Sequence, residues 1–359
     1  MAREMKRLLS SEMVGKGHPD KMCDAIGDAI LTAALKQDQD SRVAIETTGG
    51  KGKVFITGEI TTNARLNYKK IAKETLKQCG YPNYYKTKFI INLGKQSNDI
   101  AQGVNQNELA AGDQGIMYGY ATDETPNYMP LEHYWATAIA LYIDAGVVGI
   151  AFGSDFKTQV TMEGKKIQSM LISIQHDELL TIEEVREQIL QAVRVFRKDY
   201  DIKEHFRVLI NPTGRFVKGW FDADAGTTGR KIVVDAYGSR SRVGGGAFSG
   251  KDYTKVDRSA AYMARYVAKN LVANNYAKRL EIQVAYAIGV HEPVSIAVEA
   301  FGTNKVPMAD IYKAIENNFS FRVNDIINTL NLKEVDYTKY SAYGHFGRED
   351  APWERIVKL

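Results

Sequence analysis

A run of three glycines followed by a lysine, in GGGAFSGKD at residues 244–252, is the local segment best suited to binding an anion. Successive glycines leave backbone N–H groups accessible to a ligand, and Lys251 adds a positive charge beside them. From Gly245 the segment also fits GxxxxGK, the first part of a P-loop, but Asp252 stands where that motif requires a magnesium-binding Ser or Thr. We therefore predict a phosphate site unlike that of a P-loop NTPase, with a glycine-rich surface turn as the structural alternative.

Two adjacent basic residues beside a glycine turn form a second candidate phosphate site, in DADAGTTGRKIVVD at residues 222–235. Asp224 is followed six and seven residues later by Arg230 and Lys231. The guanidinium of Arg presents a planar fork to two phosphate oxygens, whereas Lys is a point charge, so the pair can bind and neutralise a polyphosphate together. A solvated basic turn is the structural alternative here.

Near the N-terminus, GKGHPDK places His18, Pro19 and Asp20 at the start of a predicted helix, with the proline at its first position. The imidazole of His18 could hydrogen-bond a phosphate oxygen, and the carboxylate of Asp20 could hold a magnesium ion that bridges phosphates. The alternative is an ordinary cap and acidic first turn, since Asp24 and Asp28 continue the same helix face at four-residue spacing.

The segment after the glycine loop, TKVDRSAAYMARYVAKNLV, predicts a helix with Thr254 as its N-cap. Asp257 in the first turn would favour the helix dipole whether or not it binds a ligand. Lys255 opposes the dipole, so its position beside the glycine loop indicates an anionic partner such as phosphate or carboxylate.

Other acidic candidates lie on strands and in a long loop. Glu46 and Glu59 are on the two strands of a predicted hairpin, where Glu usually faces solvent. Residues 94–121 are polar and rich in glycine, so we expect them to interrupt regular structure in the manner of a mobile lid. This stretch includes AGDQG, in which Asp113 is the acidic residue.

Hydrophobic periodicity repeats one unit three times: a helix, two strands joined by a turn, and a second helix. Thr181 and Glu184 fit a capping box at the start of one of these helices. The predicted elements are helices at 20–36 and 66–79 with strands at 42–48, 53–62 and 89–93, helices at 130–145 and 181–196 with strands at 157–162, 166–176 and 207–212, and helices at 255–274 and after Pro307 with strands at 281–289 and 295–302.

Antiparallel hairpins with helices on one face predict an α+β fold of three similar sheet-plus-helix domains. We place the domains at residues 7–98, 110–217 and 219–352. The helix-free sheet faces would pack against one another or against a partner subunit, so we expect a homo-oligomer. The alternative is an ordinary α+β enzyme with three unrelated hairpins.

Composition excludes several classes of protein. The 359 residues, 44% of them hydrophobic, contain no apolar run near the roughly 20 residues of a membrane helix, and the N-terminus lacks the apolar stretch of a signal peptide. We therefore expect a cytoplasmic protein without a membrane partner. The two cysteines, Cys23 and Cys79, have no disulfide or zinc spacing. The 47 basic and 43 acidic residues are interspersed, which disfavours a nucleic-acid partner.

Taken together, these segments resemble the S-adenosylmethionine synthetase (methionine adenosyltransferase) family over nearly the whole chain. The matching segments, in family order, are GHPDK, GEITT, GKQS, AGDQG, INPTGRF, TGRKI, GGGAFSGKD, KVDRSAAY and AYGHFGRE. The resemblance implies three α+β domains related by pseudo-threefold symmetry. It also implies dimers or dimers of dimers with active sites shared between subunits, ATP and L-methionine as substrates, and Mg²⁺ and K⁺ as cofactors.

The resemblance also implies residue roles. Around the triphosphate it places His18, Lys157, Arg230, Lys231 and Lys251, the groups expected to act in catalysis. For other parts of ATP it implies Asp113 at the ribose, Phe216 near the adenine, Asp224 at both substrates, and Asp155, Arg215 and Ala247 at further positions. For methionine it implies Glu59, Gln96 and Lys255, and for the metals Asp20 and Asp257 at magnesium and Glu46 near potassium.

The sequence departs from the family pattern in three places. VVGIAFGSD, before Lys157, replaces the usual approach containing Trp and Arg-Pro. GWFDAD replaces a Gly-Gly-Pro run before Asp224, and the lid between Gln96 and Ala111 is shorter than usual.

The implied reaction is a direct displacement at C5′ of ATP by the methionine sulfur. A thioether has no proton to remove, so it needs positioning and charge rather than a general base. Two rival functions are a P-loop kinase or NTPase, suggested by GxxxxGK, and a nucleic-acid-binding protein, suggested by the basic balance and 20 tyrosines.

Overall fold

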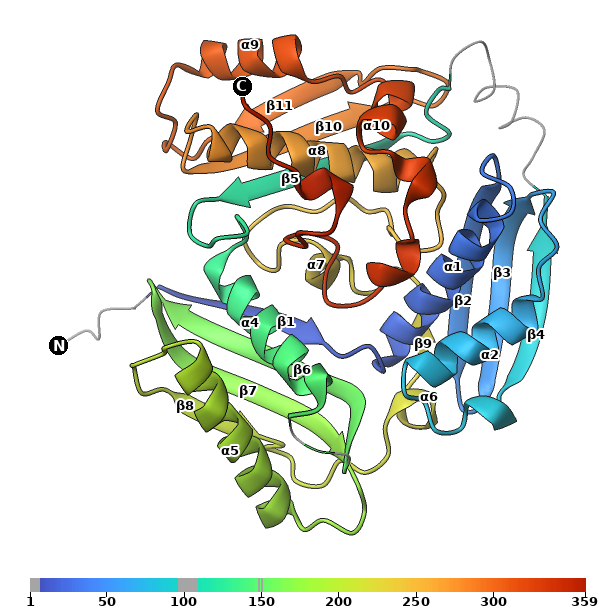
Figure 1. Ribbon diagram of the computed structural model, residues 1–359, viewed down its shortest axis with the longest axis vertical. Helices are drawn as coiled ribbons and strands as arrows, with labels where there is room; N and C mark the ends of the chain where they lie inside the picture. The colour runs from blue at the N-terminus through green and yellow to red at the C-terminus, as the bar shows by residue number, and fades with distance from the viewer. Residues whose placement is uncertain (1–6, 96–108, 148, 150) are drawn as a thin grey trace.

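Three separate β-sheets organise the chain, and helices lie against each of them (Figure 1). The computed structural model describes residues 7–95, 109–147, 149 and 151–359. Its three antiparallel hairpins and their flanking helices confirm the predicted α+β class. Within those ranges no helix has the length and apolar character needed to cross a bilayer. Gln96 and most of the predicted lid lie outside the described residues.

The first sheet has the strand order β4-β3-β2-β9, with α1 and α2 on one face. Its members are β2 (Arg42–Gly50), β3 (Lys53–Thr61), β4 (Lys88–Gly94), β9 (Gly226–Thr227), α1 (Pro19–Leu35) and α2 (Tyr68–Gln78). Side chains alternate along β2 because successive residues of a strand point to opposite faces. Val43, Ile45 and Thr47 are buried, whereas Glu46 and Thr48 are exposed on the other face.

The second sheet has the order β1-β6-β7-β8, with α4 and α5 against it. Its members are β1 (Leu8–Val14), β6 (Phe152–Glu163), β7 (Lys166–His176), β8 (Arg207–Ile210), α4 (Leu131–Tyr142) and α5 (Ile182–Asp199). The predicted capping box is present at the start of α5: the Thr181 hydroxyl accepts from the Glu184 N–H, and the Glu184 carboxylate accepts from the Thr181 N–H.

The third sheet has the order β11-β10-β5. Its members and the remaining helices are β5 (Gly115–Thr122), β10 (Arg279–Tyr286), β11 (Ser295–Glu299), α6 (Trp220–Ala223), α7 (Ile232–Asp235), α8 (Val256–Ala273), α9 (Met308–Asn318) and α10 (Val323–Thr329). Short segments complete the chain: η1 (Tyr84–Lys86), η2 (Ile143–Val147), η3 (Leu332–Glu334), η4 (Tyr337–Lys339) and η5 (Pro352–Glu354). Almost all of α8 is buried, because it lies between β5, β10, α10 and η5.

Strands are exchanged between the three parts of the sequence. β1 pairs with β6 rather than with the first sheet, β5 pairs with β10 in the third sheet, and β9 pairs with β2. The sheets therefore cross the sequence boundaries that we predicted near 98–110 and 217–219. The expectation of irregular structure up to residue 121 is wrong for β5. There Gly119 permits close packing of α8, since a Cβ would lie 2.0 Å from the Ala264 carbonyl carbon.

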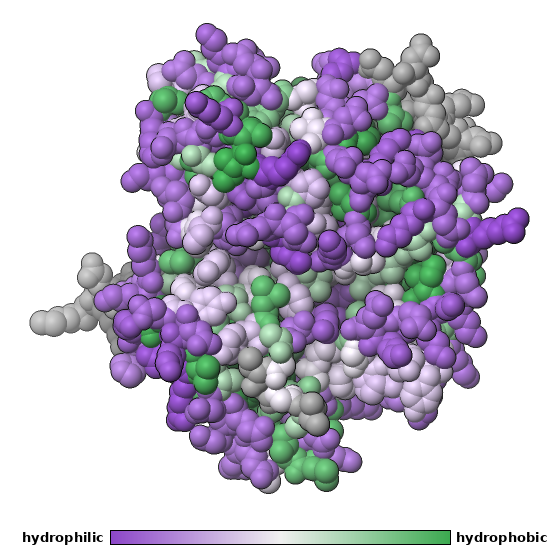
Figure 2. All heavy atoms as spheres, in the orientation of Figure 1, coloured by the Kyte–Doolittle hydropathy of each residue, from purple (hydrophilic) through white to green (hydrophobic). Residues whose placement is uncertain are grey.

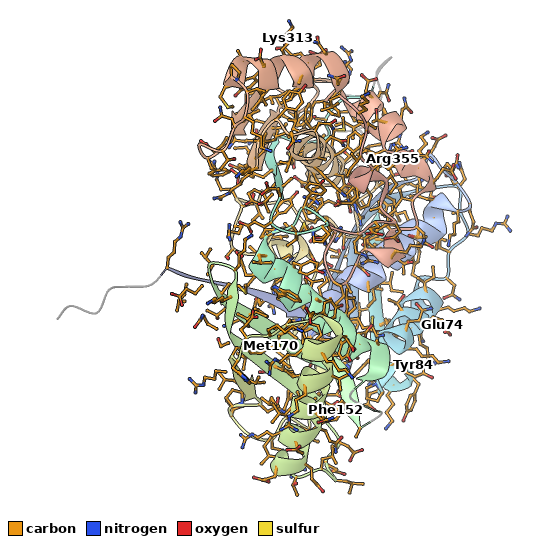
Figure 3. All side chains as sticks on the ribbon, turned by 60° about the vertical axis from the view of Figure 1, so that its left-hand side comes forward. Glu74, Tyr84, Phe152, Met170, Lys313 and Arg355 are labelled. Carbon is orange, nitrogen blue, oxygen red and sulfur yellow. The ribbon has the colours of Figure 1, made fainter. Side chains whose placement is uncertain are left out.

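Two hydrophobic cores hold these layers. One core is shared by the first and third sheets, and the other lies between the second sheet and its helices. Figure 3 labels Met170, which is fully buried in the second core, and Lys313, which is exposed on α9. Hydrophilic side chains cover most of the face in Figure 2, with hydrophobic ones in small separate patches.

Candidate active site

Both predicted phosphate loops are attached to the edge of β2. β9, at the start of the Arg230 loop, pairs with β2 and continues its sheet. Further along the same strand, the Ile45 N–H donates to the Gly250 carbonyl at 2.9 Å, and Ala44 forms an isolated bridge with Lys251. The two loops, distant in sequence, therefore lie along one strand.

The N-terminus of α1 gathers four of the predicted residues. Asp20 Oδ1 lies 2.9 Å from Arg230 Nε and accepts from the Thr227 N–H at 2.9 Å, and its Oδ2 lies 2.7 Å from Lys231 Nζ. His18 Nδ1 is 3.8 Å from the same carboxylate. Burial raises the pKa of Asp20, but the bonds from Lys231 and Thr227 outweigh it and hold the pKa below its ordinary value.

His18 is a neutral imidazole at this position. Burial lowers its pKa to about 3, and the charge of Lys231 acts in the same direction. Its Nδ1 accepts from the Asp20 N–H at 3.2 Å, which assigns the proton to Nε2. His18 is therefore the N-cap of α1, as predicted, and retains one N–H donor for a ligand.

Lys157 and Asp155, on β6, belong to the same neighbourhood. The strand lies beside the N-terminal loop, since the Gly15 N–H donates to the Phe156 carbonyl at 2.8 Å, and the charge of Lys157 lowers the pKa of His18. Asp155 accepts from the Trp220 N–H at 2.7 Å. Burial raises the pKa of Asp155 to about 6, although this hydrogen bond and Lys157 lower it. The exposed carboxylate of Asp224 raises it further.

A cavity of about 500 Å³ lies where β2, β5 and the glycine loop meet. Its lining includes five predicted residues: Glu46, Asp113, Ala247, Lys251 and Asp257. Lys251 Nζ and Asp257 Oδ2 are 2.5 Å apart, and each side chain is 24% exposed. The cavity also reaches Thr228 and Gly229, the residues just before Arg230.

The segment after Lys251 does not have the geometry of a P-loop. Asp252 is fully buried, accepts from the Val43 N–H at 2.6 Å and lies 3.1 Å from Lys255 Nζ. It therefore fixes the loop to β2 and is not free to act as a ligand. The expectation that Thr254 caps α8 is wrong: Lys255 occupies the N-cap, because the Thr254 hydroxyl is bonded to Asp252 Oδ1 at 2.6 Å.

The other predicted residues are placed apart from these two groups. Glu59 on β3 is the partner of Ala44 across the hairpin, so it shares the helix-free face with Glu46. Phe216 is held at the end of β7, where its N–H donates to His176 Nε2 at 3.0 Å and its carbonyl accepts from the His176 N–H. Arg215 is exposed beside it, with no described contact to the other candidates.

The two described segments that depart from the family pattern contact one another. Trp220 donates from its ring Nε1 to Ser154 Oγ at 3.0 Å and from its backbone to Asp155. Its ring also fills the space beside Gly153, where a Cβ would lie 2.7 Å from it. Sequence reasoning missed these contacts because nothing local connects residues 153–155 to residue 220. The signal available in the sequence was that both segments depart from the family pattern.

Among the described residues, no group of three or more His, Cys, Asp and Glu side chains is arranged to hold a metal ion. Magnesium does not require such a group, because it is usually held by one or two carboxylates together with substrate phosphates. Asp20 fits this requirement, being a buried carboxylate beside three cationic or N–H donors suited to phosphate. A metal at Asp20 would have to replace Arg230 or Lys231 on its oxygens.

Three family models match consecutive parts of the chain. They describe the N-terminal, central and C-terminal domains of S-adenosylmethionine synthetase and match residues 6–102, 108–216 and 218–355.

Curated relatives agree with the family models. A protein of Mycoplasma mycoides subsp. mycoides SC named S-adenosylmethionine synthase is 47% identical, covering 99% of this chain and 96% of its own. One of the same name from Mesoplasma florum is 47% identical over 99% of both chains, and one from Clostridium botulinum is 45% identical over 99% of this chain and 98% of its own. The chain belongs to the S-adenosylmethionine synthetase family.

Proposed function

We propose that this chain forms S-adenosylmethionine from L-methionine and ATP, as a methionine adenosyltransferase, and hydrolyses the triphosphate to pyrophosphate and phosphate. The observation that carries the proposal is the attachment of two phosphate loops to one strand, with His18 and Asp20 beside one loop and an acidic cavity beside the other. Similarity to proteins named S-adenosylmethionine synthase over almost the full chain supports it.

In this reaction the sulfur lone pair attacks C5′ as the C5′–O bond breaks, and the electron pair leaves with the triphosphate. Negative charge therefore grows on the phosphate oxygens, and positive charge appears on sulfur. Cations and N–H donors fixed around the triphosphate stabilise the transition state. We assign this role to His18 Nε2–H, Lys157, Arg230, Lys231 and Lys251.

The free protein keeps several of these cations paired with carboxylates. Lys231 and Arg230 are held by Asp20, and Lys251 is held by Asp257. When magnesium triphosphate is bound, Asp20 and Asp257 would hold the metal, and the phosphates would accept from Arg230, Lys231 and Lys251. The cationic groups therefore begin close to their bound positions, which reduces the ordering that binding requires.

Magnesium would be held by Asp20 and by Asp257 beside Lys251, and it would supply electrostatic stabilisation of the leaving phosphates. Potassium would lie near Glu46, an exposed carboxylate that lines the cavity. Both assignments fit hard cations, which prefer oxygen ligands.

The remaining predicted residues are assigned to parts of the two substrates. We assign methionine to Glu59, Gln96, Lys255 and Asp224, the ribose to Asp113, and the adenine to Phe216. Further ATP contacts are assigned to Asp155, Arg215 and Ala247. Asp113 and Asp224 are exposed carboxylates, which suits stabilisation of a nascent sulfonium.

A second copy of the chain would complete the site. The helix-free face of the first sheet presents Glu46 and Glu59 together with Phe55 and Ile90, which are 38% and 54% exposed. Apolar side chains around acidic ones on an open sheet face are typical of a surface that another subunit covers. We propose a homodimer, or a dimer of dimers, with active sites shared across this face.

The test is to follow S-adenosylmethionine, pyrophosphate and phosphate while the protein is incubated with ATP, Mg²⁺ and K⁺, with and without methionine. Sulfonium product that requires methionine supports the proposal. ATP hydrolysis at a rate that methionine does not change would favour the rival nucleotide hydrolase. A folded protein that consumes neither substrate would overturn the assignment.

A further inference from the structure

Three aspartates follow one face of α1 at four-residue steps, and each is bonded to the backbone of a phosphate loop. Asp20 Oδ1 accepts from the Thr227 N–H, Asp24 Oδ1 from the Gly229 N–H and Asp28 Oδ1 from the Gly250 N–H, each at 2.9 Å. All three are at most 1% exposed. Since a helix rises 1.5 Å per residue, the steps are about 6 Å each. We refer to Asp20, Asp24 and Asp28 as the aspartate ladder.

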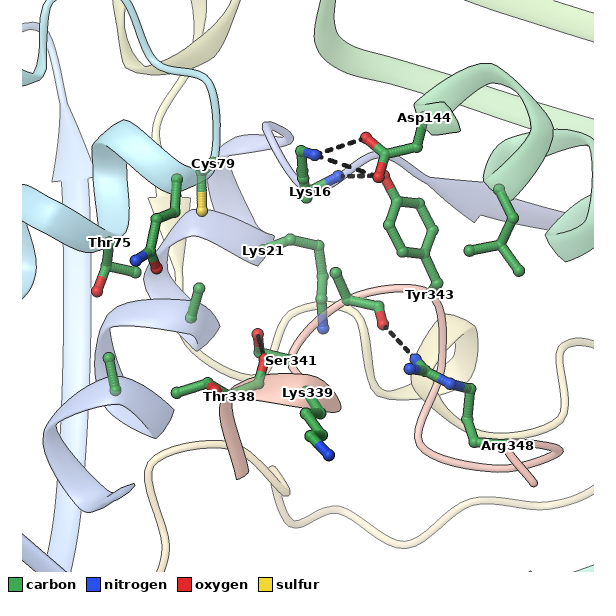
Figure 4. A pocket seen from close by; sticks show the side chains of 15 residues that line it. Lys16, Lys21, Thr75, Cys79, Asp144, Thr338, Lys339, Ser341, Tyr343 and Arg348 are labelled. Atoms are coloured by element: carbon green, nitrogen blue, oxygen red, sulfur yellow. Dashed lines mark hydrogen bonds and ion pairs between the residues drawn. The ribbon is translucent and has the colours of Figure 1, made fainter. Parts of the chain in front are cut away.

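Each carboxylate of the ladder has a cationic partner, as a buried charge requires. Asp24 lies 2.9 Å from Lys21 Nζ, which also lies 2.5 Å from Asp235. Lys21 extends from α1 along a separate cavity of about 270 Å³ that is not part of the phosphate site (Figure 4). Asp28 binds Arg258 through both oxygens, at 2.8 and 3.0 Å.

Glycines bring the loops into direct contact with the backbone of α1. A Cβ at Gly226 would lie 2.1 Å from the Pro19 carbonyl oxygen, and a Cβ at Gly27 would lie 3.0 Å from the Gly250 Cα. Gly250 has a φ of +81°, and a Cβ there would lie 2.1 Å from the Ile45 oxygen. The loops therefore have little freedom to slide along α1, and the ladder bonds fix their register.

The ladder bonds also fix the cationic residues that directly follow Gly229 and Gly250 in the sequence. Arg230 and Lys231 come directly after Gly229, and Lys251 comes directly after Gly250. Arg258 strengthens the second attachment, because it also donates to the Lys251 carbonyl at 3.0 Å. Fixing the N–H of one glycine therefore fixes the origin of the neighbouring cationic side chains.

We propose that Asp24 and Asp28 are positioning residues for the triphosphate, each holding one phosphate loop at a set height along α1. They act through the loops without contacting the substrate, and the proposal rests on the proposed function only in identifying the ligand as a triphosphate. It applies to each loop separately, whether the two loops serve one site or two sites of a dimer.

The cleanest test is at Asp24, because Lys21 keeps Asp235 as a partner when Asp24 is changed. Asp24→Asn retains an oxygen that can accept from Gly229, whereas Asp24→Leu keeps the branched shape, with a larger volume, and has no acceptor. A second matched pair, Asp28→Asn/Arg258→Met and Asp28→Leu/Arg258→Met, makes the same comparison at Gly250 without leaving a buried charge unpaired. The control is Lys269→Met, which breaks a buried ion pair with Glu354 between α8 and the C-terminal segment, away from both loops, and leaves Arg265 as the partner of that carboxylate.

Affinity for Mg²⁺ and inorganic tripolyphosphate is measured by calorimetry, beside kcat and KM for ATP and the melting temperature. We expect each Leu variant to bind tripolyphosphate about tenfold or more weakly than its Asn counterpart, because Leu leaves the buried loop N–H without the acceptor that the Asn amide oxygen retains. The rise in KM for ATP should follow. The control should lose thermal stability without losing affinity.

Equal affinities within both matched pairs would overturn the proposal and leave the aspartates a purely structural role. The same follows if the control loses as much affinity as the Leu variants. Wild-type protein that binds tripolyphosphate but makes no sulfonium product would refute the proposed function and leave the ladder testable by affinity. Wild-type protein that binds no tripolyphosphate would overturn the ladder as well.

Discussion

Replacement of Lys251 by methionine is expected to weaken triphosphate binding strongly, because it removes a cation from the site and leaves the carboxylate of Asp257 without its partner. The side chain is 24% exposed and lies 2.5 Å from Asp257, so a phosphate there would gain a hydrogen bond to a charged and partly desolvated donor. Such bonds contribute about 1.5–3 kcal/mol, which corresponds to roughly 10- to 100-fold in the dissociation constant. Lys251→Met also leaves Asp257 uncompensated, and its charge would repel the phosphates.

The second effect can be separated from the first. Lys251→Met/Asp257→Asn removes the repelling carboxylate, so without Mg²⁺ it should bind tripolyphosphate more tightly than Lys251→Met without reaching the wild-type affinity. Lys166→Met, at the exposed first residue of β7, is a matched control for the loss of one lysine. Titration calorimetry with tripolyphosphate, first without and then with Mg²⁺, measures all four proteins. Wild-type affinity in Lys251→Met would refute the phosphate role of the glycine loop.

Two further predictions concern pH and subunit sharing. Burial raises the pKa of Asp155 to about 6, so kcat/KM should fall below that pH as the carboxylate is protonated and its bond from Trp220 weakens. The pH profile of Asp155→Asn should lack this acidic fall. Because the folded pKa lies above the ordinary 3.8, the wild type should also lose stability relative to Asp155→Asn as pH rises from about 4 to 6, which thermal melts at each pH measure. If two subunits share each site, with Lys231 and Lys251 from different chains, co-expressed Lys231→Met and Lys251→Met chains should recover about a quarter of wild-type activity, since random pairing leaves one intact site in each mixed dimer. No recovery above the separate variants would place both lysines in one chain's site.

Local patterns in the sequence predicted the elements that depend on local interactions. The cap at His18 and Pro19, the capping box at Thr181 and the three hairpins are confirmed, because their signals lie within a few residues. β1 and β5 were missed because each pairs with a strand more than a hundred residues away. Nothing within such a segment specifies its partner strand. In β5 the glycines that allow packing against α8 also weaken the sequence pattern of a strand.

The site residues divide in the same way. Residue type and spacing predicted that Arg230, Lys231 and Lys251 suit phosphate, and the structure places Lys231 and Arg230 on Asp20. Their assigned roles stay predictions until a ligand is measured. The spacing of Asp24 and Asp28 was visible in the sequence and was interpreted as an ordinary helix face. Only the fold reveals that backbone N–H groups from distant loops meet those carboxylates.

This arrangement has a consequence for how the chain tolerates change. A loop held only by its own turns would shift with each substitution around it, whereas these loops are bonded to β2 on one side and to α1 on another. The divergent segments at Ser154 and Trp220 contact each other and reach the site through Asp155 and the residues leading to Asp224. Changes there can alter the approach to the site while the phosphate loops keep their register on α1, because none of the ladder bonds passes through those segments.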